Sequence, residues 1–230
     1  MNADGTNNKQ LTFDVSRKGE PSVSPDGRYI VFTSTRAGVA QVWRMDIDGS
    51  NAKQLSNGQS NWKPRCSFDS QSVIYTSYGT EVPTLWKVSI AGGNPVQLTD
   101  YRSELLAISP RDGQIAYLTW NNDEQAGPQR RVVVMPFEGG PSTRTFDIIG
   151  VLRTVKWTPD GSALTYIDSR GGLSNIWSQP IDGGPPKQLS NFKSDLIFSY
   201  AWSQDGKKLA LARGSLNKDV VLIRDITHAQ

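Results

Sequence analysis

The sequence is poor in the residues that most hydrolases and metal sites use. Its 230 residues include one cysteine, Cys66, and one histidine, His228. One cysteine excludes an internal disulfide, and the chain has no cluster of His and Cys that could hold zinc. A Ser-His-Asp triad is disfavoured because the lone histidine stands near the C-terminus and no Gly-x-Ser-x-Gly elbow is present. We therefore expect no metal, no cofactor and no enzymatic activity.

Long apolar runs and dense basic blocks are also missing. No run of apolar residues approaches the length of a membrane span, and the segment from Met1 to Gly5 has no apolar signal core. The formal net charge is +3, and basic residues adjoin only in pairs such as Arg130-Arg131. These features argue against a membrane span and against nucleic acid as a partner. The compartment stays open: the chain is cytoplasmic, or it is part of a longer secreted or anchored protein, which its start in mid-repeat favours.

What the sequence does contain is a recurring turn. Ser24-Pro25-Asp26-Gly27 precedes an apolar stretch, and related turns begin at Ser67, Ser109, Thr158 and Ser203. The Pro presets φ, the Asp can bond the backbone downstream of it, and the Gly accepts positive φ. Units of about 42 to 49 residues, each carrying four strands, are typical of propeller blades.

A second motif follows each turn by about twenty residues. Val42 to Gly49, then Lys53-Gln54-Leu55-Ser56, reads as a strand, a Gly-bearing turn and another strand. Trp43, Trp86 and Trp177 recur at one position of the third strand. A repeated tryptophan can be a ligand platform, but packing between blades is the stronger interpretation.

The predicted fold is all-β: a single five-bladed β-propeller domain over residues 1–230, with four-stranded antiparallel blades. The chain begins with the end of a blade and stops after two further strands, near 208–212 and 220–226. We expect residues 8–12 to complete the last blade as its outer strand, with Leu11 beside Leu222, which would close the ring. Counted from turn to turn, the repeats start near 24, 67, 109, 158 and 203.

The residue just before each turn is apolar, and we expect this position to pack between neighbouring blades. The series is Val23, Cys66, Ile108, Trp157 and Trp202. Cys66 is therefore interpreted as a small buried hydrophobe, not a reactive thiol.

Candidate binding residues lie in the connections from the fourth strand of one blade to the first strand of the next. These connections should share one face of the propeller with those between strands two and three, and loops on a rigid scaffold often carry function. The predicted rim around the central tunnel is Arg17, Glu20, Trp62, Lys63, Arg65, Tyr101, Arg102, Glu104, Arg153, Phe192, Lys193 and Asp195. Its mixed charge and aromatic side chains suit a peptide or protein better than a phosphate backbone, although an ordinary polar rim without a ligand is an equal alternative.

Two further features leave alternatives open. The stretch from Trp120 to Arg130 is longer than the other connections between strands two and three. It could be a binding lid, but a tolerated insertion is the preferred interpretation. A pair of carboxylates across the tunnel mouth, Glu20 with Glu104 or Asp195, is the remaining enzymatic hypothesis, because glycoside hydrolysis needs two carboxyl groups. These residues do not share one repeat position, which weakens that hypothesis.

The motifs at 24–32 and 43–56 resemble TolB-type propeller repeats, and the resemblance spans essentially the whole chain. Related blades occur in a periplasmic translocation protein that binds a lipoprotein, in propellers of prolyl-oligopeptidase-like hydrolases, and in sensor regions of bacterial regulators. The resemblance implies a monomeric, bacterial, periplasmic or otherwise extracytoplasmic scaffold or sensor domain. We predict a protein- or peptide-binding module; the alternatives are an accessory propeller of a larger hydrolase or signalling protein and, with less support, a glycoside-processing enzyme.

Overall fold

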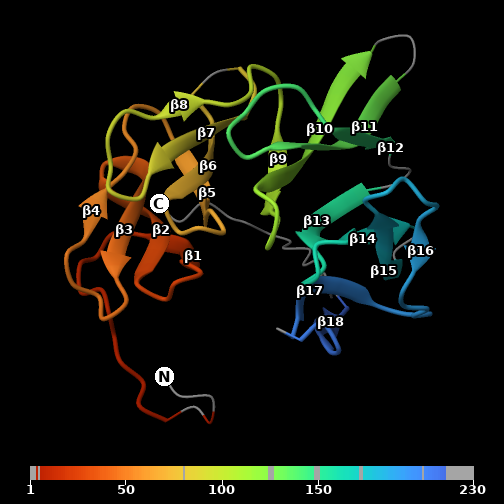
Figure 1. Cartoon of the computed structure of the whole chain (residues 1–230). Helices are drawn as coiled ribbons and strands as arrows, with labels where there is room; N and C mark the ends of the chain where they lie inside the picture. The colour runs from red at the N-terminus through yellow and green to blue at the C-terminus, as the bar shows by residue number, and fades with distance from the viewer. Residues whose placement is uncertain are drawn as a thin grey trace, which may run out of the picture.

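The computed structural model describes residues 4, 6–79, 81–123, 127–147, 151–170, 173–203 and 205–215, with side chains for all but 121–123, 127–129, 151–153 and 170. Within these ranges the chain forms eighteen β-strands and no helix (Figure 1). The strands belong to five separate sheets that follow one another along the chain. The all-β prediction is therefore confirmed.

Four of the sheets contain four antiparallel strands in sequence order, as propeller blades do. Blade one consists of β1 (Lys18–Val23), β2 (Tyr29–Ala37), β3 (Val39–Asp46) and β4 (Lys53–Gln54), and blade two of β5 (Asn61–Cys66), β6 (Ser72–Ser77), β7 (Thr84–Ser89) and β8 (Val96–Gln97). Blade three consists of β9 (Glu104–Ile108), β10 (Gln114–Asp123), β11 (Gly127–Pro136) and β12 (Arg144–Asp147), and blade four of β13 (Val151–Trp157), β14 (Ala163–Arg170), β15 (Leu173–Pro180) and β16 (Lys187–Gln188).

The fifth sheet is described only in part. It contains β17 (Leu196–Trp202) paired with β18 (Leu209–Gly214). The predicted third strand at 220–226, including Leu222, lies outside the described residues. Residues 8–12 are not assigned to a strand; Leu11 instead packs against Ile30, Phe32 and Met45 of blade one. A fifth blade closed by the N-terminal segment thus stays a prediction.

The recurring turn has the predicted hydrogen bonds. In the first copy, Gly27 donates its backbone N–H to the Ser24 carbonyl at 2.8 Å, and Gly27 has a φ of 72°. The Ser24 hydroxyl donates to the Asp26 carboxylate at 2.6 Å, and that carboxylate accepts the Arg28 N–H at 3.1 Å. The same side-chain bond joins Ser67 to Asp69, Thr158 to Asp160 and Ser203 to Asp205. These local bonds explain why Ser or Thr and Asp recur together.

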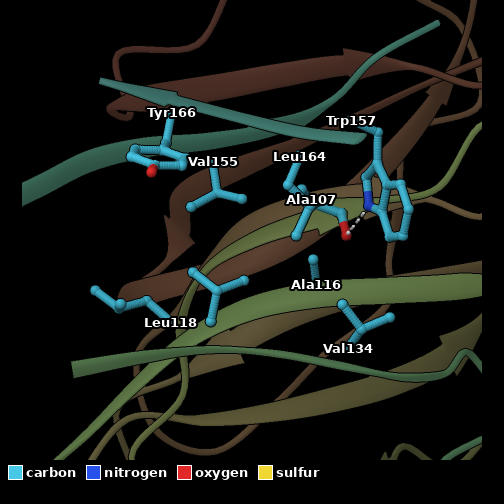
Figure 2. Close-up of a cluster of buried hydrophobic side chains, with 9 residues drawn as sticks. Ala107, Ala116, Leu118, Val134, Val155, Trp157, Leu164 and Tyr166 are labelled. Carbon is cyan, nitrogen blue, oxygen red and sulfur yellow. Dashed lines mark hydrogen bonds between the residues drawn. The ribbon is translucent and has the colours of Figure 1, made fainter. Parts of the chain in front are cut away.

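The core lies between neighbouring blades (Figure 2). One cluster joins Ala107, Ala116 and Val134 of blade three to Val155, Trp157 and Leu164 of blade four. The Trp157 indole N–H donates to the Ala107 carbonyl at 3.3 Å. A second cluster contains Cys66 among residues of blades one and two. Packing between blades is thus confirmed for both Trp157 and Cys66.

The repeated tryptophans behave in the same way. Trp86 packs partly buried against the cluster between blades one and two, and Trp177 against that between blades three and four. Trp43 packs beside Leu11 on blade one. Packing between blades is confirmed for Trp86 and Trp177, and for Trp43 it stays a prediction.

One sequence expectation is wrong in detail. Val23 was expected to pack between blades, but it is 54% exposed and belongs to none of the hydrophobic clusters that the described residues form.

The stretch from Trp120 to Arg130, interpreted from its length as a tolerated insertion, consists largely of paired strand. Strands β10 and β11 stay paired as far as Asp123 and Gly127, so that a two-stranded arm extends beyond the blade (Figure 1).

Candidate functional site

Two sets of connections converge on one face, as predicted. Tyr78, which follows β6, donates its backbone N–H to the carbonyl of Ser60, which precedes β5, at 2.8 Å. Thr35 makes the equivalent bond to the Arg17 carbonyl at 3.0 Å in blade one. The loops before strand one and after strand two therefore support each other at the channel mouth.

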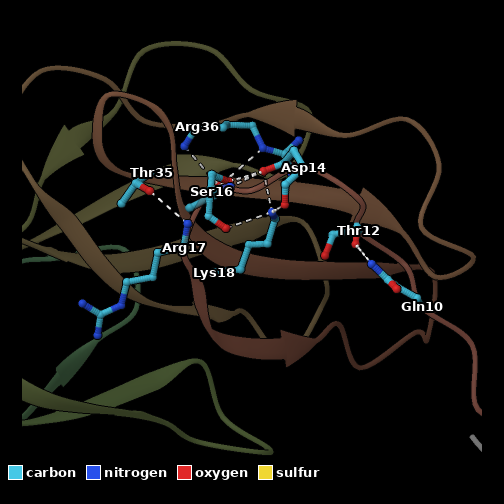
Figure 3. Close-up of polar contacts among 9 residues, drawn as sticks. Gln10, Thr12, Asp14, Ser16, Arg17, Lys18, Thr35 and Arg36 are labelled. Atoms are coloured by element: carbon cyan, nitrogen blue, oxygen red, sulfur yellow. Dashed lines mark hydrogen bonds and ion pairs between the residues drawn. The ribbon is translucent and has the colours of Figure 1, made fainter.

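A polar cluster fixes the loop that enters β1 (Figure 3). The Asp14 carboxylate pairs with Lys18 at 2.5 Å and with Arg36 at 3.1 Å, and the Ser16 hydroxyl donates to the same carboxylate. The bonds from Lys18 and Ser16, followed by the charge of Arg36, hold the pKa of Asp14 well below its usual range. These bonds therefore fix the conformation of the loop.

Four predicted rim residues lie together at the junction of blades one and two. The Glu20 carboxylate accepts the backbone N–H of Lys63 at 2.7 Å. The Arg17 guanidinium lies 5.7 Å from the ring centroid of Trp62. Glu20, Trp62 and Lys63, together with Tyr78, line a pocket of about 210 Å³. The pocket thus combines aromatic walls with charges of both signs.

Arg65 is among the residues that line the central cavity. A cavity of about 610 Å³ between the innermost strands of blades one to four has Glu20, Lys63, Arg65 and Lys156 among its lining residues. The Arg65 guanidinium donates to the Pro64 carbonyl at 2.8 Å. The channel and the pocket share Glu20 and Lys63, so the two hollows adjoin.

The predicted rim residues of blade three form their own group. The Tyr101 and Tyr117 hydroxyls lie 2.5 Å apart, although the Tyr101 side chain is otherwise exposed. Arg102 pairs with Glu104 at 3.3 Å and lies 4.8 Å from the ring centroid of Trp120. This group rests on the base of the β10–β11 arm.

The last group belongs to the connection between β16 and β17. Arg213 lies 3.6 Å from the ring centroid of Phe192 and 3.7 Å from the Asp195 carboxylate. Lys193 donates to the side-chain carbonyl of Asn191 at 2.8 Å. The side chain of Arg153 lies outside the described residues, so its predicted place on the rim is not tested.

The sequence reasoning missed two residues of the site. Lys156 lines the channel, and Tyr78 forms a wall of the pocket. Lys156 stands just before Trp157 as Arg65 stands just before Cys66, so alignment of the repeats carried the signal for it. Tyr78 lies in a connection between strands two and three, which the prediction assigned to this face without naming residues.

The described ranges contain no group of three His, Cys, Asp or Glu side chains that could hold a metal ion. None of their secondary structure is a helix of the length and hydropathy needed to cross a membrane. Burial raises the pKa of the Cys66 thiol to about 12, which is not the state of a nucleophile.

Known proteins share this architecture. The chain is 27% identical over 174 residues to an uncharacterized protein of Agrobacterium fabrum, an alignment that covers 73% of this chain and 45% of the relative. It is 40% identical over 48 residues to the Tol-Pal system protein TolB of Bordetella pertussis, covering 21% of this chain and 11% of that one. The chain therefore spans less than half the length of these curated relatives.

Solved structures show the same fold at lower identity. The oligogalacturonate lyase of Vibrio parahaemolyticus superposes with a TM-score of 0.70 at 15% identity, covering 89% of this chain and 61% of the lyase. At this identity the likeness concerns the fold alone. The sequence profile of the TolB beta propeller domain matches residues 1–127, more than half of the chain. The protein therefore belongs to the TolB beta propeller family.

Proposed function

We propose that this propeller is a non-enzymatic module that binds a protein or peptide at the mouth of its central channel. The observation that carries the proposal is the pocket formed by Trp62 and Tyr78 beside the charged side chains of Glu20 and Lys63. Aromatic side chains in concave, partly desolvated positions are the usual anchors of protein interfaces. The hydrogen bonds of the surrounding loops hold these anchors in place.

The carboxylates give less support to glycoside hydrolysis. Glu104 is paired with Arg102, and Asp195 with Arg213. The Glu20 carboxylate accepts a backbone N–H from the next blade. Each of the three thus has a structural partner, whereas a general acid needs a carboxyl group in an environment that raises its pKa.

A peptide display experiment tests the binding role. The intact protein is used to select peptides from a random library, and the affinity of the selected peptides is compared for Trp62→Ala and Phe68→Ala. Phe68 is the matched control because it is an exposed aromatic on a turn, away from the mouth. We expect affinity to fall only in Trp62→Ala. If no peptide is enriched, or if both variants behave as the native protein does, the proposal is wrong.

An accessory role within a longer chain is the second candidate. The observation favouring it is that the chain covers 45% of the Agrobacterium relative and 61% of the lyase. The test is the full reading frame around these residues, followed by an activity assay of the longer protein with and without Trp62→Ala. Unchanged activity in that variant would argue against gating at the mouth.

We also propose that the ring has five blades and that residues 8–12 complete the last one. Lys9 Nζ donates to the Asp48 carbonyl at 3.2 Å, just as Lys53, one repeat later, donates to the Ala91 carbonyl at 2.6 Å. The Gln10 side chain donates to the Thr12 carbonyl at 2.7 Å (Figure 3), as other outer strands do within themselves. These two side-chain hydrogen bonds match those of the outer strands in other blades, and this likeness supports the proposal.

A cysteine pair tests this closure. In a Cys66→Ala background, Leu11→Cys with Leu222→Cys should form a disulfide in the native protein, because cross-linked Cα atoms must lie within about 7 Å. Leu11→Cys with Leu189→Cys is the control pair. Cross-linking in neither pair, or equally in both, would contradict the closure.

We further propose that the domain acts outside the cytoplasm as a monomer, as TolB-type repeats imply. Light scattering of the purified protein and fractionation of cells that express the full reading frame are the measurements. A dimeric mass or a cytoplasmic fraction would contradict it.

A further inference from the structure

The central channel is bounded by the innermost strands of four blades. β1, β5, β9 and β13 each supply residues to the wall of the cavity of about 610 Å³. Arg65 and Lys156 occupy the same repeat position in β5 and β13, immediately before the apolar residue that packs between blades. Their cationic groups therefore enter one cavity from two different blades.

A shared distortion of these strands shapes the wall. Glu20, Lys63 and Leu105 stand at the same repeat position, with φ values of 55°, 57° and 52°. The pairing of strands one and two shifts register at this point in blades one to four, and one residue earlier in the described part of the fifth sheet. Bulges of this kind re-aim side chains, and left-handed non-glycine residues gather at functional sites.

The two channel cations are only partly compensated. Burial lowers the pKa of the Arg65 guanidinium, and the charge of the Glu20 carboxylate raises it in part. Neither Arg65 nor Lys156 forms an ion pair with any residue that the structure describes, and both side chains are partly buried. Arg65 donates to the Pro64 carbonyl and Lys156 to the Tyr200 carbonyl. Burial lowers the pKa of Lys156, and the charge of Arg65 lowers it further.

Lys63 adds a third cation to the same wall, and among the lining residues that the structure describes Glu20 is the one carboxylate. The Glu20 carboxylate already accepts the Lys63 N–H. The channel wall therefore carries two more positive than negative groups, in surroundings where water screens them poorly. An anion that enters would relieve this repulsion.

We propose that the channel binds the acidic side chains of a peptide whose preceding apolar side chain fills the Trp62–Tyr78 pocket. Arg65 and Lys156 hold the carboxylates, and Lys63 lies where the pocket and the channel meet. Charge-assisted hydrogen bonds from a guanidinium or ammonium to a carboxylate are stronger than neutral ones. This assignment rests on the proposed peptide-binding function and adds the chemistry of the peptide to it.

The test uses the intact protein and labelled hexapeptides in a fluorescence anisotropy titration. Gly-Leu-Gly-Glu-Glu-Gly is compared with its neutral counterpart Gly-Leu-Gly-Gln-Gln-Gly. We expect the acidic peptide to bind about tenfold more tightly or better, and to lose that advantage when salt rises from about 0.05 M to about 0.5 M. Equal affinity for the two peptides would overturn the proposal.

Variants locate the site. Arg65→Gln and Lys156→Gln should each weaken binding of the acidic peptide about tenfold, whereas Arg65→Lys should retain most of it. Lys187→Gln, on the exposed outer strand β16, is the control and should bind as the native protein does. Circular dichroism checks the fold of each variant, and unchanged binding in folded Lys156→Gln would overturn the proposal even if Arg65→Gln does not fold.

Two further outcomes distinguish the binding of acidic side chains in the channel from the broader proposal that the mouth binds peptides. If Trp62→Ala weakens binding of neutral peptides while Arg65→Gln and Lys156→Gln leave acidic ones unaffected, the mouth binds peptides and the channel assignment is wrong. If a galacturonate oligomer binds more tightly than the acidic peptide, the channel takes carboxylates but the peptide assignment is wrong.

Discussion

The Glu20 side chain reaches from blade one to accept the backbone N–H of Lys63 in blade two at 2.7 Å. The two residues stand at one repeat position, and both have left-handed backbone conformations. The bond therefore joins the bulge of one blade to the bulge of the next. It links the architecture of the ring directly to the shape of the channel mouth.

Removing this bond should destabilise the protein. Glu20→Ala leaves the Lys63 N–H without its acceptor, and we expect the free energy of unfolding to fall by about 1 to 2 kcal/mol in urea titrations. Glu20→Gln retains an acceptor oxygen and should lose less. Glu104→Ala is the control, because its partner Arg102 is near the surface and such pairs contribute less than about 1 kcal/mol. An equal loss in Glu20→Ala and Glu104→Ala would contradict this account.

Truncating a side chain in the contact between blades three and four should lower the free energy of unfolding more than truncating an exposed side chain of the same type. Leu164 is 1% exposed within the cluster of Figure 2, and Leu164→Ala should lower the free energy of unfolding by about 2 to 5 kcal/mol. Leu189→Ala removes the same atoms from a side chain that is 47% exposed. That control should change stability by less than about 1 kcal/mol. Chemical denaturation measures both variants, and similar losses would mean that the interface between blades is not the main core.

The turn aspartates predict a loss of stability in acid. The Thr158 hydroxyl, then the Ser162 backbone N–H, lowers the pKa of Asp160 to about 2. Because this value lies below the unfolded one of about 3.9, the contribution is complete above about pH 4 and is lost as pH falls through about 2. Asp160→Asn should flatten the dependence of unfolding free energy on pH in this window. Asp112→Asn, at the glycine position of the divergent third turn, should leave it unchanged; the reverse pattern would refute the assignment.

Cys66 should react slowly while the protein is folded. Burial raises the pKa of its thiol to about 12, so at pH 8 only a fraction on the order of 10⁻⁴ is thiolate. A chromogenic disulfide reagent should therefore modify Cys66 much more slowly in the native protein than in urea. Comparable rates in the two states would show that the cluster between blades one and two opens readily.

The parts of the fold that could be predicted are those set by residues close together in the sequence or recurring at one repeat position. The Ser24–Asp26 turn depends on bonds between residues two to five apart, so its sequence alone specifies it. Apolar residues at a constant repeat position likewise indicated that Cys66 and Trp157 pack between blades. Whether such a residue is buried depends also on whether a neighbouring blade packs against it. Val23 stands at the same repeat position as Cys66 and Trp157, yet its side chain is exposed.

Features set by pairing across strands escaped the sequence reading. The β10–β11 arm stays regular because each strand gives the other its hydrogen-bonding partner, whereas its composition resembles that of a loop. The left-handed positions themselves, Glu20 and Lys63, are not glycines, so the sequence did not indicate them, and the bulges change which side chains meet in the channel. The common repeat position of Arg65 and Lys156 could be read from the sequence, but only the structure shows that both residues line one cavity.

The left-handed backbone at Glu20, Lys63 and Leu105 has an implication for protein engineering. Each non-glycine residue in this conformation costs on the order of 1 kcal/mol, which glycine would avoid. At Lys63, glycine would relieve this strain but would remove a cation from the channel mouth. At Glu20, glycine would also remove the acceptor of the Lys63 N–H, and at Leu105 it would remove a side chain that packs against the core between blades three and four. Stability and recognition therefore compete directly at Lys63, and laboratory selection for heat resistance there should weaken recognition.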